Sequence, residues 1–408
     1  MRKTITTLLL TLGTASAMPS PLMARQNNPA PGSHKLIIGA PFQILTADFD
    51  GTKFSITGNH TASGKAPSWL LYREPNLVYA VNENADDLGV FALDSSLSNP
   101  TLKSSGSGSA GVVFLEFDAN KTRMVGAAYG SGKIDVWDTT ATDGSVKLIK
   151  SITIEGEPNP AQGAHHPHQA LLDPTGRFFV IPNLGGDTLL VLDTKDDKYE
   201  ITSYVTLPTG TGPRHGGFIT DGESHYYALA SELSNDLFLF AVTYPDQNIA
   251  FEQIQKQSTY GANPPANATS AAAGELIVSA PVPLDTNDNK NKTLTTQKHV
   301  YVSNRISGNA TDSIAHFLFK SGPPRLDFAE SVSTAGLRPR MFSLSTDKQQ
   351  TLAFVANQGG DAGLAAFKRN PDSGALDPTP VATVPSSALV APELAATEYM
   401  GPQFVQEI

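Results

Sequence analysis

Histidine and arginine gather beside proline and glycine at three places in the chain. These segments are 164–169 (AHHPHQ), 212–216 (GPRHG) and 337–341 (LRPRM). Imidazole changes its charge near neutral pH, and a guanidinium group binds carboxylates through paired hydrogen bonds. Three roles are open for the histidines: proton transfer, metal binding, or hydrogen bonding to loops. Of these, proton transfer in a catalytic site is favoured.

Other kinds of active site find little support in the sequence. His166 and His168 lie two residues apart, so in an extended segment they point to one side, with His165 opposite. Paired histidines are common metal ligands, but a third ligand of ordinary spacing is missing. The chain has no cysteine, no Gly-x-Ser-x-Gly elbow, no His-Glu-x-x-His motif and no phosphate-binding loop before a helix. We therefore expect neither a metal site nor a cofactor.

A diverged repeat indicates how such distant residues could meet. Six times a polar turn precedes an apolar strand, and a second apolar strand follows as its hairpin partner. Equivalent positions in the six units are Asn82, Tyr129, Asn183, Ser231, Asn304 and Asn357. They are separated by 47, 54, 48, 73 and 53 residues, close to the roughly 40–50 residues of a four-stranded propeller blade. The longest step contains 258–296, rich in Ala, Asn, Pro, Thr and Lys, which predicts an exposed insertion.

The repeat predicts an all-β fold, a seven-bladed β-propeller that spans 35–408 as a single domain. Strands expected at 36–38, 42–48 and 53–56 supply the seventh blade, and 404–408 supplies its remaining strand. Pairing the two chain ends in one blade closes the ring and hides edge strands that an open sheet leaves exposed. A two-domain β protein or an array of β-sandwiches is the rival architecture, but neither explains the shared period.

In a propeller, equivalent residues of successive blades face a common channel. The residues that follow the six equivalent positions include Glu83, Glu232, Arg305 and Gln358. Each charge alone has a simple interpretation as a solvated loop residue. As a set, these residues predict a ring of polar and ionisable side chains around the channel.

The first 17 residues have the pattern of a secretory signal peptide, with Arg2 and Lys3 before an apolar stretch at 5–12 and a small-residue cleavage site at 15–17. Residues 18–34, rich in Pro, Asn and Ala, are expected to form a disordered leader. Five Asn-x-Ser/Thr sequons add to this pattern. They predict glycosylation, and with the signal a secreted protein, extracellular or in the cell wall. The five asparagines are Asn59, Asn120, Asn267, Asn291 and Asn309.

Composition excludes several classes of partner. A formal net charge of −10, without a basic cluster, argues against nucleic acid as a partner. No segment approaches the ~20 apolar residues of a transmembrane helix, and there is no polybasic tether, so we expect no membrane insertion. Because the 408 residues include no cysteine, stability must come from a large closed core and not from disulfides.

Several motifs, in order along the chain, resemble the lactonase and carboxymuconate cyclase family of seven-bladed propellers. They are HPHQ at 166–169 followed by DPTGR at 173–177, GPRH at 212–215, SEL at 231–233, SNR at 303–305 and ANQ at 356–358. The resemblance extends from about residue 36 to the C-terminus. The family includes propeller-type 6-phosphogluconolactonase and fungal 3-carboxy-cis,cis-muconate cyclase, so the resemblance implies an enzyme that forms or opens a small carboxylated lactone without a cofactor.

The resemblance places the family's proposed active site on four residues of this chain. Arg214 and Arg305 would clamp substrate carboxylates and stabilise an enolate-like transition state. His168 and Glu232 would transfer protons, to carbon or from an attacking water. Further substrate-binding candidates around the channel are His166, Gln169, His215, Glu83, Arg340 and Gln358.

The secretion signal departs from the family, because such enzymes are expected inside the cell. A secreted or cell-wall glycoprotein that binds glycans or proteins through its propeller loops, without catalysis, is therefore the alternative. The intact set of four residues favours an enzyme, since a binding scaffold has no need of two buried arginines beside histidine and glutamate.

Overall fold

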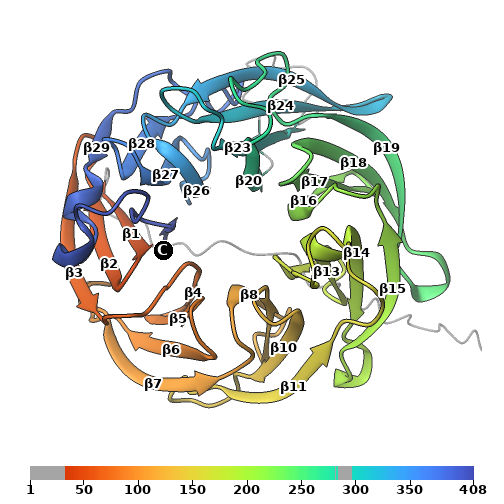
Figure 1. The fold of residues 1–408 in the computed structure, drawn as a ribbon, viewed down its shortest axis with the longest axis horizontal. Coiled ribbons are helices and arrows are strands. Elements are labelled where there is room, and N and C mark those ends of the chain that lie inside the picture. The colour runs from red at the N-terminus through yellow and green to blue at the C-terminus, as the bar shows by residue number, and fades with distance from the viewer. Residues whose placement is uncertain (1–32, 281, 284–295) are drawn as a thin grey trace, which may run out of the picture.

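The computed structural model describes residues 33–280, 282–283 and 296–408. The expected signal peptide at 1–17, nearly all of the expected leader at 18–34, and Asn291 lie outside the described residues. Seven four-stranded antiparallel sheets stand in a ring around a central axis (Figure 1). The predicted all-β, seven-bladed propeller is confirmed.

The blades follow one another along the chain. Blade 1 contains β4 (Leu70–Arg73), β5 (Leu77–Val81), β6 (Asp87–Ala92) and β7 (Thr101–Ser107). Blade 2 contains β8 (Val112–Phe117), β9 (Arg123–Ala128), β10 (Lys133–Asp138) and β11 (Lys147–Thr153). Blade 3 contains β12 (Leu171–Leu172), β13 (Phe178–Asn183), β14 (Thr188–Asp193) and β15 (Glu200–Thr206). Blade 4 contains β16 (Pro213–Asp221), β17 (Ser224–Ser231), β18 (Asp236–Thr243) and β19 (Ala250–Ser258).

Three blades complete the ring. Blade 5 contains β20 (Ala272–Val278), β23 (His299–Arg305), β24 (Ser313–Ser321) and β25 (Pro324–Ser333), with a small hairpin of β21 (Val282–Pro283) and β22 (Thr296–Gln297) beside it. Blade 6 contains β26 (Leu337–Leu344), β27 (Leu352–Gly359), β28 (Leu364–Lys368) and β29 (Ala382–Val384). Blade 7 contains β30 (Phe404–Glu407), β1 (His34–Ala40), β2 (Gln43–Phe49) and β3 (Phe54–Thr61). The helices in the described residues are short 3₁₀ turns at Leu184–Gly186, Lys195–Asp197, Pro245–Gln247, Ser386–Ala388 and Pro392–Leu394.

Both chain ends meet in blade 7. β30 is its innermost strand and pairs antiparallel with β1, from Leu36 opposite Glu407 to Gly39 opposite Phe404. The C-terminus consequently lies at the inner edge of the ring (Figure 1). Phe404 and Val405 are buried among the apolar side chains of blades 1, 6 and 7. The predicted closure of the ring by the N- and C-terminal strands is confirmed.

The burial pattern changes from the inside of each blade to its rim. The second strands are sandwiched between neighbouring blades and read as continuous apolar runs, as in the fully buried β13. The outermost strands, such as β11 and β15, alternate between exposed and half-buried residues, as is typical of strands with one solvent-exposed face. Apolar clusters fill the spaces between adjacent blades, which join the seven sheets into one ring.

Aspartates fix several turns between the first and second strands. The Asp118 carboxylate accepts the backbone N–H groups of Thr122 and Arg123 at 2.7 and 2.9 Å. The Asp173 carboxylate likewise accepts those of Arg177 and Phe178, at 3.0 and 2.7 Å. Such side-chain bonds stabilise tight turns, which explains the polar turn signals at the start of the repeated units.

The segment 258–296 differs from its prediction as an exposed insertion. β20 lies within it and forms the innermost strand of blade 5, with Ala273 and Leu276 buried. The sequence of β20, AAGELIV, carries few of the β-branched and aromatic residues that mark a strand, so the pattern concealed it. The exposed part before β20 is limited to the loop around 261–269.

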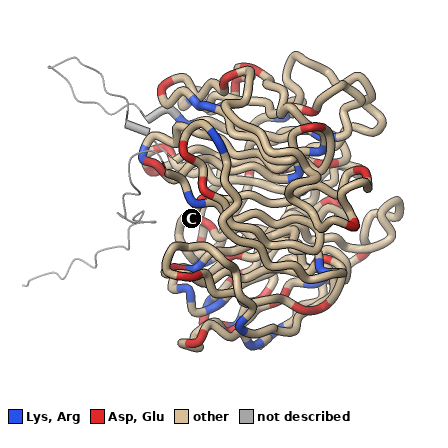
Figure 2. Tube along the Cα trace, turned by 90° about the vertical axis from the view of Figure 1, so that its left-hand side faces the viewer, with Lys and Arg blue, Asp and Glu red and all other residues tan. Residues whose placement is uncertain are grey.

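The surface shows no strong separation of charge on the side seen in Figure 2, where basic and acidic residues alternate along the turns. In the described part of the chain, no helix has the length and apolar character needed to cross a membrane.

Candidate active site

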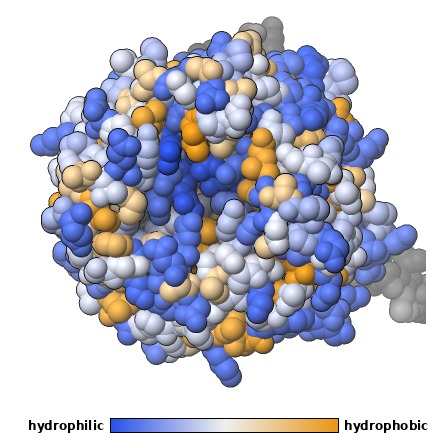
Figure 3. Space-filling view, viewed as in Figure 1, coloured by the Kyte–Doolittle hydropathy of each residue, from blue (hydrophilic) through white to orange (hydrophobic). Residues whose placement is uncertain are grey.

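A small cavity lies where the innermost strands of the blades converge. Its lining comes from all seven blades: Ser68, Trp69, Val113, His168, Arg214, His215, Glu275, Arg340, Met341 and Gln403. Its volume of about 10 Å³ is close to the least that holds one water. On the face seen in Figure 3 the ring is hollowed at its centre, and hydrophilic residues line the hollow.

β-Bulges bring several of these side chains to the axis. The pairing of the innermost strand with its neighbour shifts register at Pro213/His215 in β16 and at Pro339/Met341 in β26. Arg214 and Arg340 are the residues skipped by the pairing. A bulge leaves one residue out of the ladder and re-aims its side chain, which is a common way of placing functional groups. β20 has a similar shift between Ala273 and Leu276, the stretch that carries Glu275.

Three of the four residues predicted as catalytic form one ion cluster. Glu232 Oε2 lies 2.9 Å from Arg214 Nε and 2.8 Å from Arg305 Nη2. Glu232 and Arg305 sit at the ends of the second strands of blades 4 and 5, whereas Arg214 is on the innermost strand of blade 4. Two members of the polar ring predicted from equivalent positions, Glu232 and Arg305, therefore lie side by side.

The arginines of this cluster keep unused donors. Arg214 is 2% exposed, yet its Nε and Nη1 donate no hydrogen bond within the described residues. Its Nε is close enough to Glu232 for an ion pair, but the N–H is not directed at the carboxylate. Arg305 Nε also lacks an acceptor among the described residues, while its Nη2 donates to the Ala273 carbonyl at 3.0 Å. A buried cationic donor without an acceptor lowers the stability of the folded protein. An anion bound at this place would accept these hydrogen bonds, so the unused donors indicate an anion-binding site.

A second ion pair joins the cluster from across the ring. Arg340 Nη2 on β26 lies 2.7 Å from Glu83 Oε2, which follows β5. These residues belong to blades 6 and 1. Three arginines consequently face two glutamates in this cluster, and Glu275, which lines the same cavity as Arg214 and Arg340, is a third acidic side chain nearby.

The charges hold Glu232 in its ionised form. Burial by itself raises the pKa of this carboxyl group, but Arg305, Arg214 and Arg340 together outweigh burial and lower the pKa below its usual value. Burial, together with the repulsion of Arg305, lowers the pKa of Arg214 to about 9. At neutral pH Glu232 is therefore a carboxylate and Arg214 a cation, which makes Glu232 a poor proton donor.

His168 is a neutral imidazole in this setting. Burial is the largest cause that lowers its pKa well below the usual value, and Arg214, His215, Arg340 and Arg305 lower it further. Its Nδ1 lies 3.0 Å from His215 Nε2, while its Nε2 makes no hydrogen bond to the described residues. A neutral imidazole with a free nitrogen accepts a proton, so His168 is suited to act as a base.

Tyr129 contacts both predicted histidines and was not among the predicted site residues. Its ring stacks on His166 at 4.2 Å and meets His168 edge-on at 5.6 Å. Burial, followed by the charge of Glu232, raises the pKa of its phenol, so the hydroxyl stays protonated. The sequence carried one signal: Tyr129 is the only large side chain among the six equivalent positions.

The three histidines of the segment 164–169 separate as expected for an extended segment. His166 and His168 both contact Tyr129, whereas His165 Nδ1 and Nε2 lie 3.0 Å from Asn183 and 3.2 Å from the Gly156 carbonyl. His166 also bonds the Tyr129 carbonyl through Nδ1, at 2.8 Å. The segment is nevertheless no regular strand, because β12 begins only at Leu171.

Two predicted substrate contacts are engaged by the protein instead. The Gln169 amide bonds both the N–H and the carbonyl of Gly216, at 2.8 and 3.2 Å, so it ties blades 3 and 4 together. His215 uses Nε2 toward His168 and Nδ1 toward Glu275. Since both residues are buried with their polar atoms occupied, neither presents a free group to a substrate. Glu275 was missed because it lies in the segment predicted to be an insertion.

Gln358 lies apart from the ion cluster. It lines another cavity, of about 320 Å³, formed by the end of β27 and the loop 385–401. In this loop Tyr399 lies under the Arg338 guanidinium, 3.5 Å from it. Among the described residues, no three His, Asp or Glu side chains form a group that could hold a metal ion.

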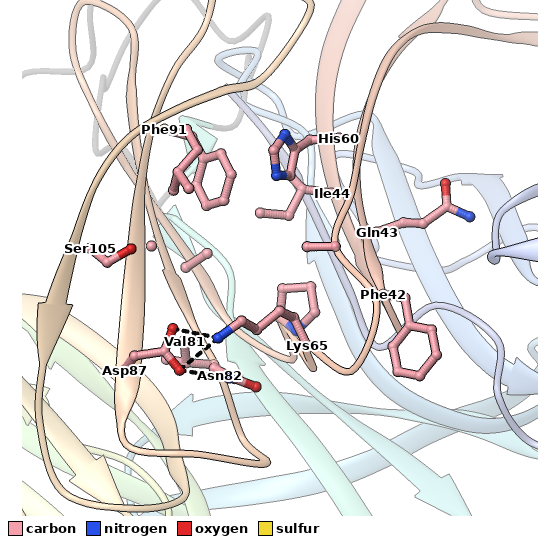
Figure 4. Close-up of a pocket in the computed structure, with 15 residues that line it drawn as sticks. Phe42, Gln43, Ile44, His60, Lys65, Val81, Asn82, Asp87, Phe91 and Ser105 are labelled. Atoms are coloured by element: carbon pink, nitrogen blue, oxygen red, sulfur yellow. Dashed lines mark hydrogen bonds and ion pairs between the residues drawn. The ribbon is translucent and has the colours of Figure 1, made fainter.

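A third cavity lies between blades 7 and 1, away from the predicted site residues. It measures about 100 Å³ and is mainly apolar. His60 and Phe91 stand at one end and the Lys65–Asp87 ion pair at the other (Figure 4). Asn82 ties this end together by accepting the Ala66 N–H and donating to Asp87. This cavity contains none of the convergent charges of the channel.

Comparison with known proteins gives the family and the fold. The family model described as "Lactonase, 7-bladed beta-propeller" matches residues 35–392. An Arthroderma benhamiae protein named "Probable 6-phosphogluconolactonase" is 28% identical over 355 residues, covering 84% of this chain and 83% of its own length. The structure of the Pseudomonas aeruginosa periplasmic gluconolactonase superposes with a TM-score of 0.72 at 22% identity, covering 92% of this chain and 99% of that one. A Lactobacillus plantarum protein structure gives a TM-score of 0.70 at 23% identity, with 92% and 99% coverage.

Proposed function

Because this chain belongs to the lactonase family of seven-bladed β-propellers, we propose that it is an enzyme that opens a small anionic lactone at its central channel. The observation that carries the proposal is the buried Arg214, whose Nε and Nη1 have no acceptor among the described residues. A substrate carboxylate or phosphate supplies that acceptor. The names of the related 6-phosphogluconolactonase and gluconolactonase support a sugar lactone as the substrate class.

The substrate binds through the guanidinium donors of the cluster that have no acceptor in the described part of the protein. Arg214 and Arg305 share Glu232, so each retains donors that can turn to a ligand. Arg340 adds a third guanidinium from blade 6. Arginine binds carboxylates and phosphates bidentately, which fixes the orientation of the substrate as well as its position. Glu232 keeps the arginines together in the absence of a ligand.

The ring is opened by water. His168 Nε2 takes a proton from water while the water oxygen attacks the lactone carbonyl carbon. The resulting oxyanion is stabilised by the adjacent Arg214 guanidinium. The ring C–O bond then breaks, and the proton held by His168 passes to the departing ring oxygen, so that one lactone and one water give one hydroxy acid. A lowered pKa makes the protonated His168 a good donor for this last step.

Cyclisation of 3-carboxy-cis,cis-muconate is the related reaction that the same side chains could support. There a substrate carboxylate oxygen adds to a double bond, and the neighbouring carbon receives a proton. That step requires a protonated acid in the resting enzyme. Since the pKa of His168 is lowered by burial and Glu232 is held ionised, the site is better suited to accept a proton first, which favours hydrolysis.

The test measures turnover of purified mature protein on 6-phosphogluconolactone, unphosphorylated gluconolactone and 3-carboxy-cis,cis-muconate. His168→Ala should lower kcat by about 100-fold or more, the range expected when a proton-transfer group is lost. Arg305→Ala should raise KM for the anionic substrate by about 10- to 100-fold, as for a lost charged hydrogen bond. Arg325→Ala, at an arginine on β25 whose side chain is 43% exposed, is the matched control and should change neither constant.

Turnover of none of these substrates would contradict the proposed function. The non-catalytic alternative, a binding glycoprotein, would then be examined by screening the same protein against glycans and extracellular proteins. Turnover of the muconate alone would instead assign cyclisation to the site.

We also propose that the protein is secreted and N-glycosylated. The signal-like pattern at 1–17 supports this proposal. So does the exposure of four sequon asparagines in the described part of the chain: Asn59, Asn120, Asn267 and Asn309.

A further inference from the structure

A chain of three buried side chains connects the proposed base to a carboxylate two blades away. Glu275 Oε1 lies 2.8 Å from His215 Nδ1, and His215 Nε2 lies 3.0 Å from His168 Nδ1. The three residues come from blades 5, 4 and 3, and their exposed fractions are 1%, 1% and 6%. We propose that Glu275 and His215 are positioning residues that fix the protonation pattern of His168, so that its Nε2 lone pair faces the channel.

The pattern follows from the carboxylate end of the chain. A carboxylate oxygen only accepts hydrogen bonds, and Glu275 Oε1 also accepts the backbone N–H of Leu276 at 3.1 Å. His215 must therefore carry its proton on Nδ1. A neutral His215 then has a bare Nε2, which can only accept. His168 consequently donates from Nδ1, and its own Nε2 is left bare.

Both imidazoles are neutral at physiological pH. Burial lowers the pKa of His215, although Glu275 opposes the shift, and Arg214 and Arg305 add to it. The groups that face His168 are Tyr129, whose ring meets it edge-on, and Arg214, His215, Arg340 and Arg305. The last four disfavour a second proton on His168. The carboxylate of Glu275 is the counter-charge at the far end of the chain. When His168 takes up a proton, its Nδ1 proton can move toward His215 Nε2, which brings positive charge closer to Glu275.

We call the chain of Glu275, His215 and His168 the relay. The surrounding residues hold it in one orientation. The rings of Trp69 and Phe114 contact the His215 ring edge-on, at 5.8 and 5.7 Å. The Ser303 hydroxyl accepts the Glu275 backbone N–H at 2.9 Å, which fixes the bulged part of β20. Gly274 is required beside it, because a side chain there would meet the Ser303 hydroxyl and the Arg305 side chain. A histidine fixed in this way has one tautomer, the device by which a carboxylate prepares a histidine base.

The first test reads the tautomer directly and needs no substrate. Two-bond ¹H–¹⁵N spectra of ¹⁵N-histidine-labelled protein distinguish protonated from bare ring nitrogens, and His168→Gln identifies the His168 signals among the nine histidines. We expect a protonated Nδ1 and a bare Nε2. His215→Phe keeps a ring in place but removes the acceptor, so His168 should lose this fixed pattern. A wild-type His168 with a protonated Nε2 overturns the relay.

The kinetic test rests on the proposed lactone hydrolysis. His215→Phe should lower kcat by about 100-fold, with KM changed less than threefold, because His215 has no group free for substrate. Glu275→Gln keeps an acceptor for His215 Nδ1 and should lose less activity than Glu275→Leu. The matched control is His316→Phe, which breaks a second buried histidine pair, His299 Nδ1 to His316 Nε2 at 2.9 Å, within blade 5.

The possible results distinguish a failure of the proposed relay from a failure of the proposed lactone hydrolysis. A fall in kcat equal in His316→Phe and His215→Phe, with folding confirmed by circular dichroism, would make the His215 effect merely structural and overturn the relay. Unchanged kcat in His215→Phe overturns it as well. If the wild type turns over no lactone, the proposed function fails, and the tautomer spectra alone decide on the relay.

Discussion

At the scale of single residues, charge organises the channel. Three arginines converge on two glutamates, and the buried Arg214 has no acceptor of its own for two of its donors. Such an arrangement is unfavourable in an empty protein and favourable around an anion. It also keeps His168 neutral, because an additional positive charge beside three guanidinium groups is strongly disfavoured.

The pH dependence of activity should show this effect. The base form of His168 is required, and its pKa is lowered well below the ordinary 6.5. On acidification, activity is lost only when the pH falls through that lowered value. We therefore expect the acid limb of kcat/KM, which reports on the free enzyme, to lie below pH 6.5.

The profile is measured with a lactone whose own charge is constant over the range, with circular dichroism at each pH to show that the protein remains folded. An acid limb at or above pH 6.5 would contradict the assignment of His168 as the base. In Glu232→Gln the residual activity should keep a low acid limb, because removing an acid increases the positive potential at His168.

Three of the four polar residues predicted around the channel do lie there, because equivalent positions of a repeat converge, whereas Gln358 lines another cavity. Glu83, Glu232 and Arg305 follow equivalent points of the units, and the structure places them near the axis. Their partners could not be predicted in the same way. The Arg340–Glu83 pair joins residues 257 positions apart, and no local pattern encodes such a contact.

At the scale of elements, bulges in the innermost strands are as important as the strands themselves. They take Arg214 and Arg340 out of the ladder and turn them to the axis. The second strands were predictable from their apolar runs and turn signals; for example, the equivalent position Asn304 lies in β23, His299–Arg305. Most of the innermost strands were not, because they are short or irregular and carry polar residues toward the channel; β30, expected at 404–408, is the exception. β20, with its Ala and Gly residues, is the clearest case.

The last strand carries a large share of the packing at the ring closure. Phe404 is 1% exposed and its ring meets Trp69 edge-on at 5.1 Å. Phe404→Ala should lower the free energy of unfolding by about 3–4 kcal/mol, the cost of deleting a buried aromatic side chain. Urea denaturation followed by tryptophan fluorescence measures the change.

Ile149→Ala serves as the comparison, because Ile149 is an exposed residue on the outermost strand of blade 2. Its effect should remain within about 0.5 kcal/mol. Equal effects of the two substitutions would show that β30 contributes no more than a rim strand.

At the scale of the whole molecule, the exposed sequons make the secretion proposal measurable. Protein expressed in a glycosylating host with its own N-terminus should appear in the medium, begin after residue 17, and lose mass on enzymatic removal of N-glycans. Asn→Gln at Asn59, Asn120, Asn267 and Asn309 should reduce that mass loss stepwise. Retention inside the cell with residues 1–17 intact would contradict secretion.

The closure of blade 7 also sets the order of events during translation. Its outer three strands are made first, from His34 to Thr61, whereas its innermost strand, Phe404–Glu407, is made last. While the ribosome is still adding residues, β1 exposes an unpaired edge and the ring stays open. Six blades can assemble in turn as they emerge, since domains fold during synthesis. A chain that is truncated before Phe404 therefore lacks β30, and its ring cannot close even if the other six blades fold correctly.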